Sequence, residues 1–296
     1  MSLTKNKTGQ PLRLPDWLKK DILLNDNSRS VHSLIQELSL NTVCQSARCP
    51  NKTECFSNGT ATFMINGNTC TRGCTFCSVP KGKPPALPQE NESSNVAKAA
   101  QTLGLTHIVI TSVNRDDLED QGSNQFAKTI KELRTQIPNA TIEVLTPDFR
   151  GNKECITIVI DANPDIYNHN LETVPRLYKE VRPGAIYTQS LELIKFVKET
   201  NSSIITKSGI MLGLGEEKNE VIQVLEDLFN YKCDYLTLGQ YMQPTRESLS
   251  VHRYLEPKEF DEFKGIALKI GFKKVFSGPL VRSSYHAKNF HNTQES

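Results

Sequence analysis

From residue 60 onward the chain alternates short apolar runs with longer segments in which apolar residues recur three and four positions apart. The short runs are rich in β-branched residues and end at turn residues, which predicts strands. The longer segments predict amphipathic helices. We expect strands at 60–65, 107–111, 141–145, 165–168, 203–213 and 235–241, and helices at 95–103, 124–136, 188–200, 217–229 and 257–270.

Some stretches are less regular. The segment 153–162 contains the apolar run Ile156–Ile160, which is typical of a strand, whereas its place in the alternation favours a helix, and both interpretations stay open. Nearer the N-terminus, apolar side chains at helical spacing predict a helix over 30–40 with Ser30 as its N-cap. A further helix start is expected at Asp16 because it follows a proline.

The alternation amounts to about six strand–helix units, which predicts a parallel sheet covered by helices. In such sheets the chemistry lies at the carboxyl ends of the strands. Polar segments occupy the expected strand ends, so we look for a site among them. These segments are 70–77, 112–117, 168–170, 207–208 and 240–243.

Composition narrows the class of protein. The chain has 296 residues, with 35 basic and 33 acidic side chains, so its charge gives no reason to expect a nucleic acid or a membrane surface as partner. Its longest apolar run, Ile156–Ile160, is far too short to span a membrane. Because no apolar leader opens the chain, we predict a cytoplasmic protein with reduced thiols.

Six of the eight cysteines fall between Cys44 and Cys77, in two triplets of pattern C-x4-C-x5-C and C-x3-C-x2-C. Disulfides suit oxidising compartments and small cores, and neither applies to this chain. Structural zinc takes four ligands, commonly in C-x2-C pairs, whereas each triplet offers three. Clustered thiolates in a reducing compartment favour iron–sulfur clusters, and we predict two [4Fe–4S] clusters. We expect Cys155 and Cys233 to be inert free thiols.

The second triplet consists of Cys70, Cys74 and Cys77, with Phe76 directly before the last cysteine. In spacing and in this aromatic residue it resembles the radical S-adenosylmethionine (SAM) enzymes. The resemblance implies that the three thiolates hold three irons of a cluster and that the fourth iron binds SAM. One electron then cleaves SAM to methionine and a 5′-deoxyadenosyl radical. It also implies that Phe76 lies near the adenine.

The first triplet, Cys44, Cys49 and Cys55, resembles the auxiliary-cluster motif of the lipoyl synthase family. The tetrad 282–285, Arg-Ser-Ser-Tyr, is similar to a second element of that family. The resemblance implies that Ser284 is the fourth ligand of the auxiliary cluster. An alkoxide oxygen binds a soft iron–sulfur centre less well than a thiolate does, so such a cluster is easier to dismantle.

Further stretches resemble the same family. The glycine-rich segment 209–216 implies cofactor contacts at Gly213 and Glu216, and the segment after residue 168 implies a ribose contact at Asn168. His169 is either a cofactor contact or a histidine satisfied by local hydrogen bonds. Gln121 stands where the family pattern has a glycine, and we expect it to change the flexibility of its loop but not the class of reaction.

The resemblance implies a partial (β/α)6 barrel with three parts. These are an N-terminal extension with the auxiliary-cluster cysteines (1–59), the radical SAM barrel (60–270) and a closing C-terminal tail (271–296). The activity implied is the insertion of two sulfur atoms at C6 and C8 of an octanoyl chain on a carrier-protein lysine. Two SAM molecules would supply the radicals, and the auxiliary cluster would supply the sulfur.

The partners implied are an octanoylated lipoyl domain or a glycine-cleavage H-type carrier, and a ferredoxin- or flavodoxin-type electron donor. We expect a monomer that binds neither nucleic acid nor membrane. A biotin-synthase-like enzyme or a methylthiotransferase would retain the second triplet but would not account for the first triplet or for the tetrad 282–285. A zinc-stabilised binding module is the alternative without catalysis, and it would be colourless where an iron–sulfur protein is brown.

Overall fold

The computed structural model describes residues 13–19, 26–58 and 61–284. Within these ranges eight strands form one sheet in chain order, β1 to β8. The first pair, β1 and β2, is antiparallel, and every later pair is parallel. The strands are β1 (Asn41–Thr42), β2 (Thr62–Ile65), β3 (His107–Ser112), β4 (Thr141–Leu145), β5 (Ile166–Asn168), β6 (Ile205–Leu212), β7 (Tyr235–Gln240) and β8 (Lys274–Gly278).

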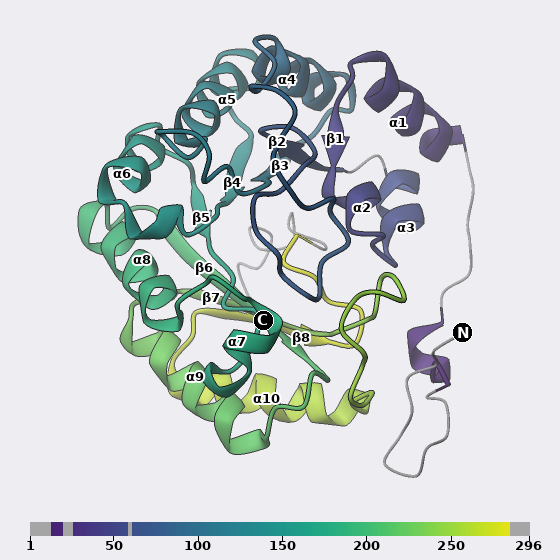
Figure 1. Cartoon of the computed structure of the whole chain (residues 1–296), viewed down its shortest axis with the longest axis vertical. Helices are drawn as coiled ribbons and strands as arrows, with labels where there is room; N and C mark the ends of the chain where they lie inside the picture. The colour runs from purple at the N-terminus through teal and green to yellow at the C-terminus, as the bar shows by residue number, and fades with distance from the viewer. Residues whose placement is uncertain (1–12, 20–25, 59–60, 285–296) are drawn as a thin grey trace.

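The longer helices that follow the parallel strands lie outside the arc of strands (Figure 1). Each parallel strand from β2 to β7 is followed by a helix of nine residues or more, which confirms the six predicted units. Because the sheet does not close between β1 and β8 in the described residues, the fold is a partial (β/α)6 barrel, as predicted. The α-helices are α1 (Asp26–Glu37), α2 (Val43–Ser46), α3 (Lys52–Ser57), α4 (Glu92–Thr102), α5 (Ser123–Gln136), α6 (Lys153–Asp161), α7 (Tyr178–Val181), α8 (Tyr187–Thr200), α9 (Lys218–Asn230) and α10 (Pro257–Ile270).

The ambiguous segment is helix α6, as its place in the alternation favoured. The side chain of Asn152 caps it by accepting a hydrogen bond from the amide of Glu154 at 2.9 Å. The buried residues of α6 are Cys155, Ile156, Val159 and Ile160, a spacing that places them on one helical face. The run of isoleucine and valine therefore reflects burial against the sheet and not strand formation.

Other boundaries differ from the predictions. Helix α1 begins at Asp26, so Ser30 lies inside it and is not its cap. The expected helix after Pro15 is a single 3-10 turn, Asp16–Leu18. Strands β1 and β8 were not predicted, because β1 has only two residues and β8 is mostly half-exposed. Gln121 adopts a left-handed conformation with φ of 51°, a region that glycine enters at less cost.

The proposed three-part division of the chain stays a prediction. Strand β1 belongs to the N-terminal part and strand β8 to the C-terminal part, and both pair with the barrel strands. Residues 285–296 of the expected tail, including Tyr285, lie outside the described residues, as do residues 1–12 of the expected extension.

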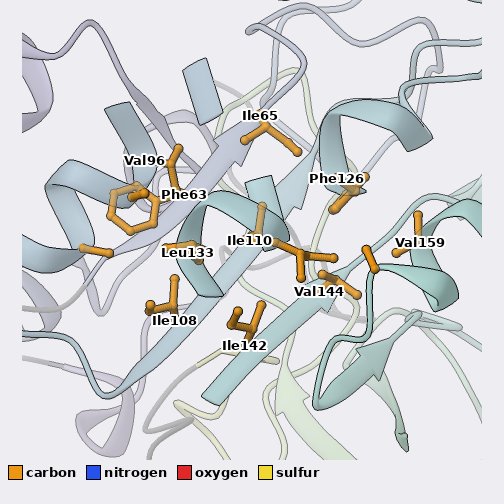
Figure 2. Packing of buried hydrophobic residues seen from close by; sticks show 14 of the residues in the cluster. Phe63, Ile65, Val96, Ile108, Ile110, Phe126, Leu133, Ile142, Val144 and Val159 are labelled. Carbon is orange, nitrogen blue, oxygen red and sulfur yellow. The ribbon is translucent and has the colours of Figure 1, made fainter. Parts of the chain in front are cut away.

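Neighbouring residues on each strand point to opposite sides of the sheet. One set packs beneath the helices in a hydrophobic core, as Figure 2 shows for Ile108, Ile110, Ile142 and Val144. These four side chains are fully buried. The intervening residues face the interior of the barrel, and among them is Glu143. The alternation thus separates a dry outer layer from an interior that contains charged groups.

His169 joins three elements of the barrel. Its Nδ1 lies 2.9 Å from the carbonyl oxygen of Thr146, which follows β4, and its Nε2 lies 3.0 Å from the hydroxyl of Ser190 in α8. A carbonyl oxygen only accepts, so Nδ1 carries the proton and Nε2 accepts from Ser190. Burial, aided by the nearby Arg182 charge, lowers the pKa of His169 from 6.5 to about 4. The histidine is therefore neutral and satisfied by local hydrogen bonds.

We expect His169 to make folding stability depend on pH. Between its unfolded and folded pKa values only the unfolded chain binds the proton, so stability falls as the pH falls through this window. From pH 7 to pH 5 the loss attributable to His169 is roughly 2 kcal/mol. Urea unfolding of the wild type and of His169→Gln at both pH values measures it. The variant should lose distinctly less stability on acidification, and equal losses in both proteins would contradict the assignment.

Candidate functional site

The interior of the barrel contains a cavity of about 490 Å³ that brings together residues from both ends of the chain. Several predicted ligands line it, namely Cys44, Cys49, Cys55, Cys77 and Ser284. Cys70 and Cys74 do not line it. Instead, Cys70 packs with Cys77 against a small apolar cluster formed by Met64, Val79 and Val113.

Short helices position the first triplet. Cys44 lies in α2, Cys55 lies in α3, and Cys49 lies between them. Burial raises the pKa of the Cys44 thiol to about 11, although hydrogen bonds from Thr62 oppose this rise. The hydroxyl oxygen of Thr62 also lies 2.9 Å from Oγ of Ser284, within hydrogen-bond distance. Thr62 thus contacts the first cysteine of the triplet and the serine predicted to complete its ligand set.

The second triplet occupies the loop that follows β2, and backbone amides point at its sulfur atoms. The amide of Asn114 lies 3.4 Å from Sγ of Cys70, and the amide of Val79 lies 3.5 Å from Sγ of Cys77. Burial raises the pKa of Cys77 to about 11 and also raises that of Cys74. Coordination by a metal would reverse this effect and deprotonate the thiols.

The arrangement of these thiols fits iron–sulfur clusters better than a single ion. In the described part of the chain no three side chains among His, Cys, Asp and Glu converge as the ligands of one metal ion would. A four-iron cluster separates its ligands more widely than one ion does, and the amides beside Cys70 and Cys77 are of the kind that tunes such clusters. The donor sets present, two triplets of thiols with backbone amides beside Cys70 and Cys77, fit the predicted groups.

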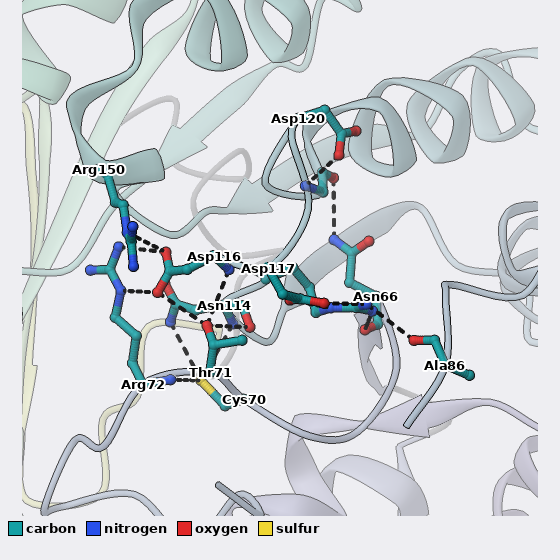
Figure 3. A network of polar contacts seen from close by, with 12 residues as sticks. Asn66, Cys70, Thr71, Arg72, Ala86, Asn114, Asp116, Asp117, Asp120 and Arg150 are labelled. Carbon is teal, nitrogen blue, oxygen red and sulfur yellow. Dashed lines mark hydrogen bonds and ion pairs between the residues drawn. The ribbon is translucent and has the colours of Figure 1, made fainter. Parts of the chain in front are cut away.

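Arg72, between the first two cysteines of the second triplet, holds this loop to the barrel (Figure 3). Its guanidinium pairs with Asp116 at 2.7 Å and with Asp148 at 2.7 Å, and these carboxylates follow β3 and β4. All three side chains are at most 9% exposed. Burial acts against the ionised carboxylates, but Arg72 more than offsets it and holds the pKa of both below the usual range.

The predicted cofactor contacts lie in different settings. Phe76 lines the cavity, whereas Asn168, Gly213 and Glu216 do not. Asn168 is buried and donates to Glu143 at 3.1 Å. Glu216 accepts hydrogen bonds from the amides of Gly213 at 2.6 Å and of Leu214 at 2.9 Å, so its carboxylate stabilises the turn after β6. Roles of these residues in cofactor binding stay predictions.

Three charged features of the site were not predicted. The first is the Arg72 clamp. The second is Arg282, which lines the cavity, where burial lowers its pKa while Cys49 and Glu172 oppose this effect. The third is Lys207, which was expected after a strand but lies inside β6, facing the interior. All three lie in segments that the sequence singled out, namely 70–77, 207–208 and the tetrad 282–285, but nothing in the sequence predicted their partners.

Comparisons with known proteins bear on the family of the chain. The profile of the Radical SAM superfamily matches residues 64–228, and the profile described as the N-terminal domain of lipoyl synthase matches residues 2–49. A lipoyl synthase of Caldanaerobacter subterraneus is 55% identical over 276 residues, which cover 93% of this chain and 96% of the relative. The lipoyl synthase of Rhodopirellula baltica is 52% identical over 283 residues, which cover 95% and 89% of the two chains.

Solved structures with low sequence identity share the fold. Methylornithine synthase (PylB) is 15% identical with a TM-score of 0.54, and the match covers 90% of this chain and 88% of that one. SuiB from Streptococcus suis is 11% identical with a TM-score of 0.56, and the match covers 90% and 63%. At this level of identity the likeness concerns the fold alone.

The clamp predicts a large effect of Arg72→Met. The substitution leaves the buried Asp148 without its cation and leaves Asp116 with only the exposed Arg150, which costs about 3–5 kcal/mol in such settings. Denaturant unfolding of the cluster-loaded protein measures the change. The matched control is Arg176→Met, which breaks the exposed pair with Glu220 and should have little effect. Equal losses in the two variants would show that Arg72 does not hold the loop.

Proposed function

The chain belongs to the lipoyl synthase family of the radical SAM superfamily, and from this premise we propose which of its residues hold the cofactors and the substrate. The enzyme is a radical SAM sulfurtransferase that uses SAM and [4Fe–4S] clusters. When bound, these groups supply a carbon-centred radical that removes hydrogen from a saturated chain, and the sulfur that replaces it.

We propose that Cys70, Cys74 and Cys77 hold the cluster that binds SAM, with Phe76 near the adenine. The amide hydrogen bonds to Cys70 and Cys77 support this role, because they favour thiolate over thiol. Arg72 keeps the loop against the ends of β3 and β4. Asn168, Gly213 and Glu216 remain proposed contacts of SAM.

We propose that Cys44, Cys49, Cys55 and Ser284 hold the auxiliary cluster. The observation that carries this proposal is their common cavity, which Cys77 of the second triplet also lines. Ser283 has other partners, because Asn170 donates to its hydroxyl at 2.8 Å. The hydroxyl of Ser284 contacts Thr62 beside Cys44, which favours Ser284 as the ligand.

The octanoyl chain is proposed to enter the same cavity. Apolar side chains of Val109, Leu145, Ile210 and Met211 contribute to its wall, and they suit a saturated acyl chain that offers no charge or hydrogen bond. The family implies a lipoyl carrier protein as substrate and a reductant. We propose a lipoyl domain or an H-type carrier for the first and a ferredoxin- or flavodoxin-type protein for the second.

None of the described helices has the length and hydropathy to cross a bilayer. All eight cysteines are free thiols, including the buried Cys155 and Cys233. On the basis of these unpaired thiols we propose that the protein acts in a reducing compartment, the cytoplasm. The monomeric state expected from the sequence stays a prediction.

Cysteine substitutions separate the two proposed clusters. In chemically reduced Cys74→Ala, the rate of SAM cleavage should fall to background, because the second triplet loses a ligand. The iron bound by the first triplet should stay in place. Cys49→Ala should retain most of the SAM cleavage and lose sulfur insertion. The measurements are 5′-deoxyadenosine, lipoyl product and bound iron per chain, all under anaerobic conditions.

Cys155→Ala is the matched control, because this buried cysteine belongs to neither triplet. It should retain both activities and the full iron content. SAM cleavage at the wild-type rate in Cys74→Ala, or lipoyl product from Cys49→Ala without added sulfide, would overturn the corresponding cluster assignment.

A further inference from the structure

The chain after β8 turns back and crosses the interior of the barrel. The amide of Val281 donates to the carbonyl oxygen of Gly278 at 3.1 Å, which forms the turn. The side chain of Asn51, at the start of α3, then donates to the carbonyl oxygen of Leu280 at 2.7 Å. The yellow segment beyond β8 in Figure 1 follows this path inside the arc of strands. We call residues 279–284 the tail segment.

The absence of a side chain at Gly239 in β7 lets the backbone of the tail segment pack against this strand. A Cβ atom at this position would lie 2.1 Å from the carbonyl oxygen of Val281, a distance that real atoms do not tolerate. The backbone of the tail segment therefore lies directly against the strand. Only a strand residue without a side chain permits this approach.

A buried ion pair holds the end of the tail segment. Lys207 in β6 and Glu143 in β4 are both 0% exposed, and Nζ of Lys207 lies 2.9 Å from Oε1 of Glu143. The same Nζ donates to the carbonyl oxygen of Ser283 at 2.6 Å. The lysine thus joins a carboxylate of the barrel interior to the backbone of the residue before Ser284.

The surroundings of Glu143 favour its ionised form, whereas burial lowers the pKa of Lys207. Burial acts to raise the pKa of Glu143, but the Lys207 charge and His107 outweigh it and hold this pKa at about 2. His107 lies 3.2 Å from the second carboxylate oxygen, and Asn168 donates to the first at 3.1 Å. A buried ion pair needs such additional hydrogen bonds to offset the loss of hydration. The carbonyl of Ser283 is one of the groups that provide them.

We infer that Lys207 and Glu143 are positioning residues that anchor the tail segment and so direct the Ser284 hydroxyl toward Cys44, Cys49 and Cys55. The inference rests on the proposed function only for the role of Ser284 as a ligand. The anchor itself follows from the contacts of Lys207. Because Ser283 is bonded through both its carbonyl and its hydroxyl, the next residue has little freedom to turn away from Thr62.

The test compares two double variants of the cluster-loaded protein. Lys207→Met/Glu143→Gln removes both charges, so neither stays buried alone. The control is Lys198→Met/Asp234→Asn, which removes another lysine–carboxylate pair, of 2.8 Å, formed between α8 and the residue before β7. Hydrogen–deuterium exchange of residues 280–284 should be at least ~tenfold faster in the first variant and unchanged in the control.

A second readout distinguishes positioning from general destabilisation. The electron paramagnetic resonance spectrum of the reduced auxiliary cluster is recorded for the wild type, for Ser284→Ala and for both double variants. If the anchor positions Ser284, the spectrum of Lys207→Met/Glu143→Gln should approach that of Ser284→Ala, whereas the control should match the wild type. A change that only lowers stability would not produce this likeness.

The outcomes separate the anchor from the ligand role. Unchanged exchange in the test variant, or equal acceleration in the control, would overturn the anchor. If the spectrum of Ser284→Ala differs from that of the wild type but the spectrum of Lys207→Met/Glu143→Gln does not, the ion pair does not position Ser284. A third outcome combines faster exchange of the tail segment in the test variant alone with a wild-type spectrum in Ser284→Ala. It would support the anchor and overturn the proposed role of Ser284 as a ligand.

Discussion

The contact between Thr62 and Ser284 joins two parts of the chain that are 222 positions apart, and the arrangement of the site depends on it. Thr62 begins β2 and contacts Cys44, so the first cysteine triplet and the tail segment meet at one strand. In a closed barrel the tail segment would have no gap between edge strands through which to reach the interior. The open sheet instead leaves β1 and β8 at its two edges, and the tail segment passes between them over Gly239.

The barrel supports this meeting by separating its two faces. Side chains such as Ile110 and Val144 form a dry layer with the helices, whereas Glu143 and Lys207 point inward from the same sheet. Charges at such positions are costly unless they are paired and further hydrogen bonded. The interior therefore carries specific polar contacts, among them the hydrogen bond to Ser283, and these contacts place the tail segment relative to the cavity.

Local pattern predicted much of the fold, and family resemblance supplied a ligand set that stays a prediction. The strand at Thr141–Leu145 and the helix at Pro257–Ile270 have the expected bounds, because their periodicity is strong and their ends are marked by turn or capping residues. Strand β8 was missed because a half-exposed strand lacks a clear apolar pattern. The cysteines stand out by spacing, and the cavity that several of them share is a property of the fold alone.

The partners of the buried charges could not be predicted, because they are distant in the chain. Nothing near Arg72 in the sequence identifies Asp148 as its partner, and the pairing of Lys207 with Glu143 appears only when β4 and β6 flank β5. The role of the turn that contains Gly213 and Glu216 could not be predicted from its motif either. Its residues match a cofactor motif, yet the carboxylate of Glu216 bonds to amides of the turn itself, and the carbonyl oxygen of Gly213 accepts from the amide of His252.

The central claim is that residues from the two ends of the chain hold one cluster, with oxygen from Ser284 on one iron. Mössbauer spectra of iron-57-loaded wild type, Ser284→Cys and Ser283→Cys test it most directly. The account predicts that one iron of the auxiliary cluster differs from the others in the wild type and becomes thiolate-like in Ser284→Cys, while Ser283→Cys leaves the spectrum unchanged. Identical spectra for the wild type and Ser284→Cys, or a change in Ser283→Cys alone, would contradict it.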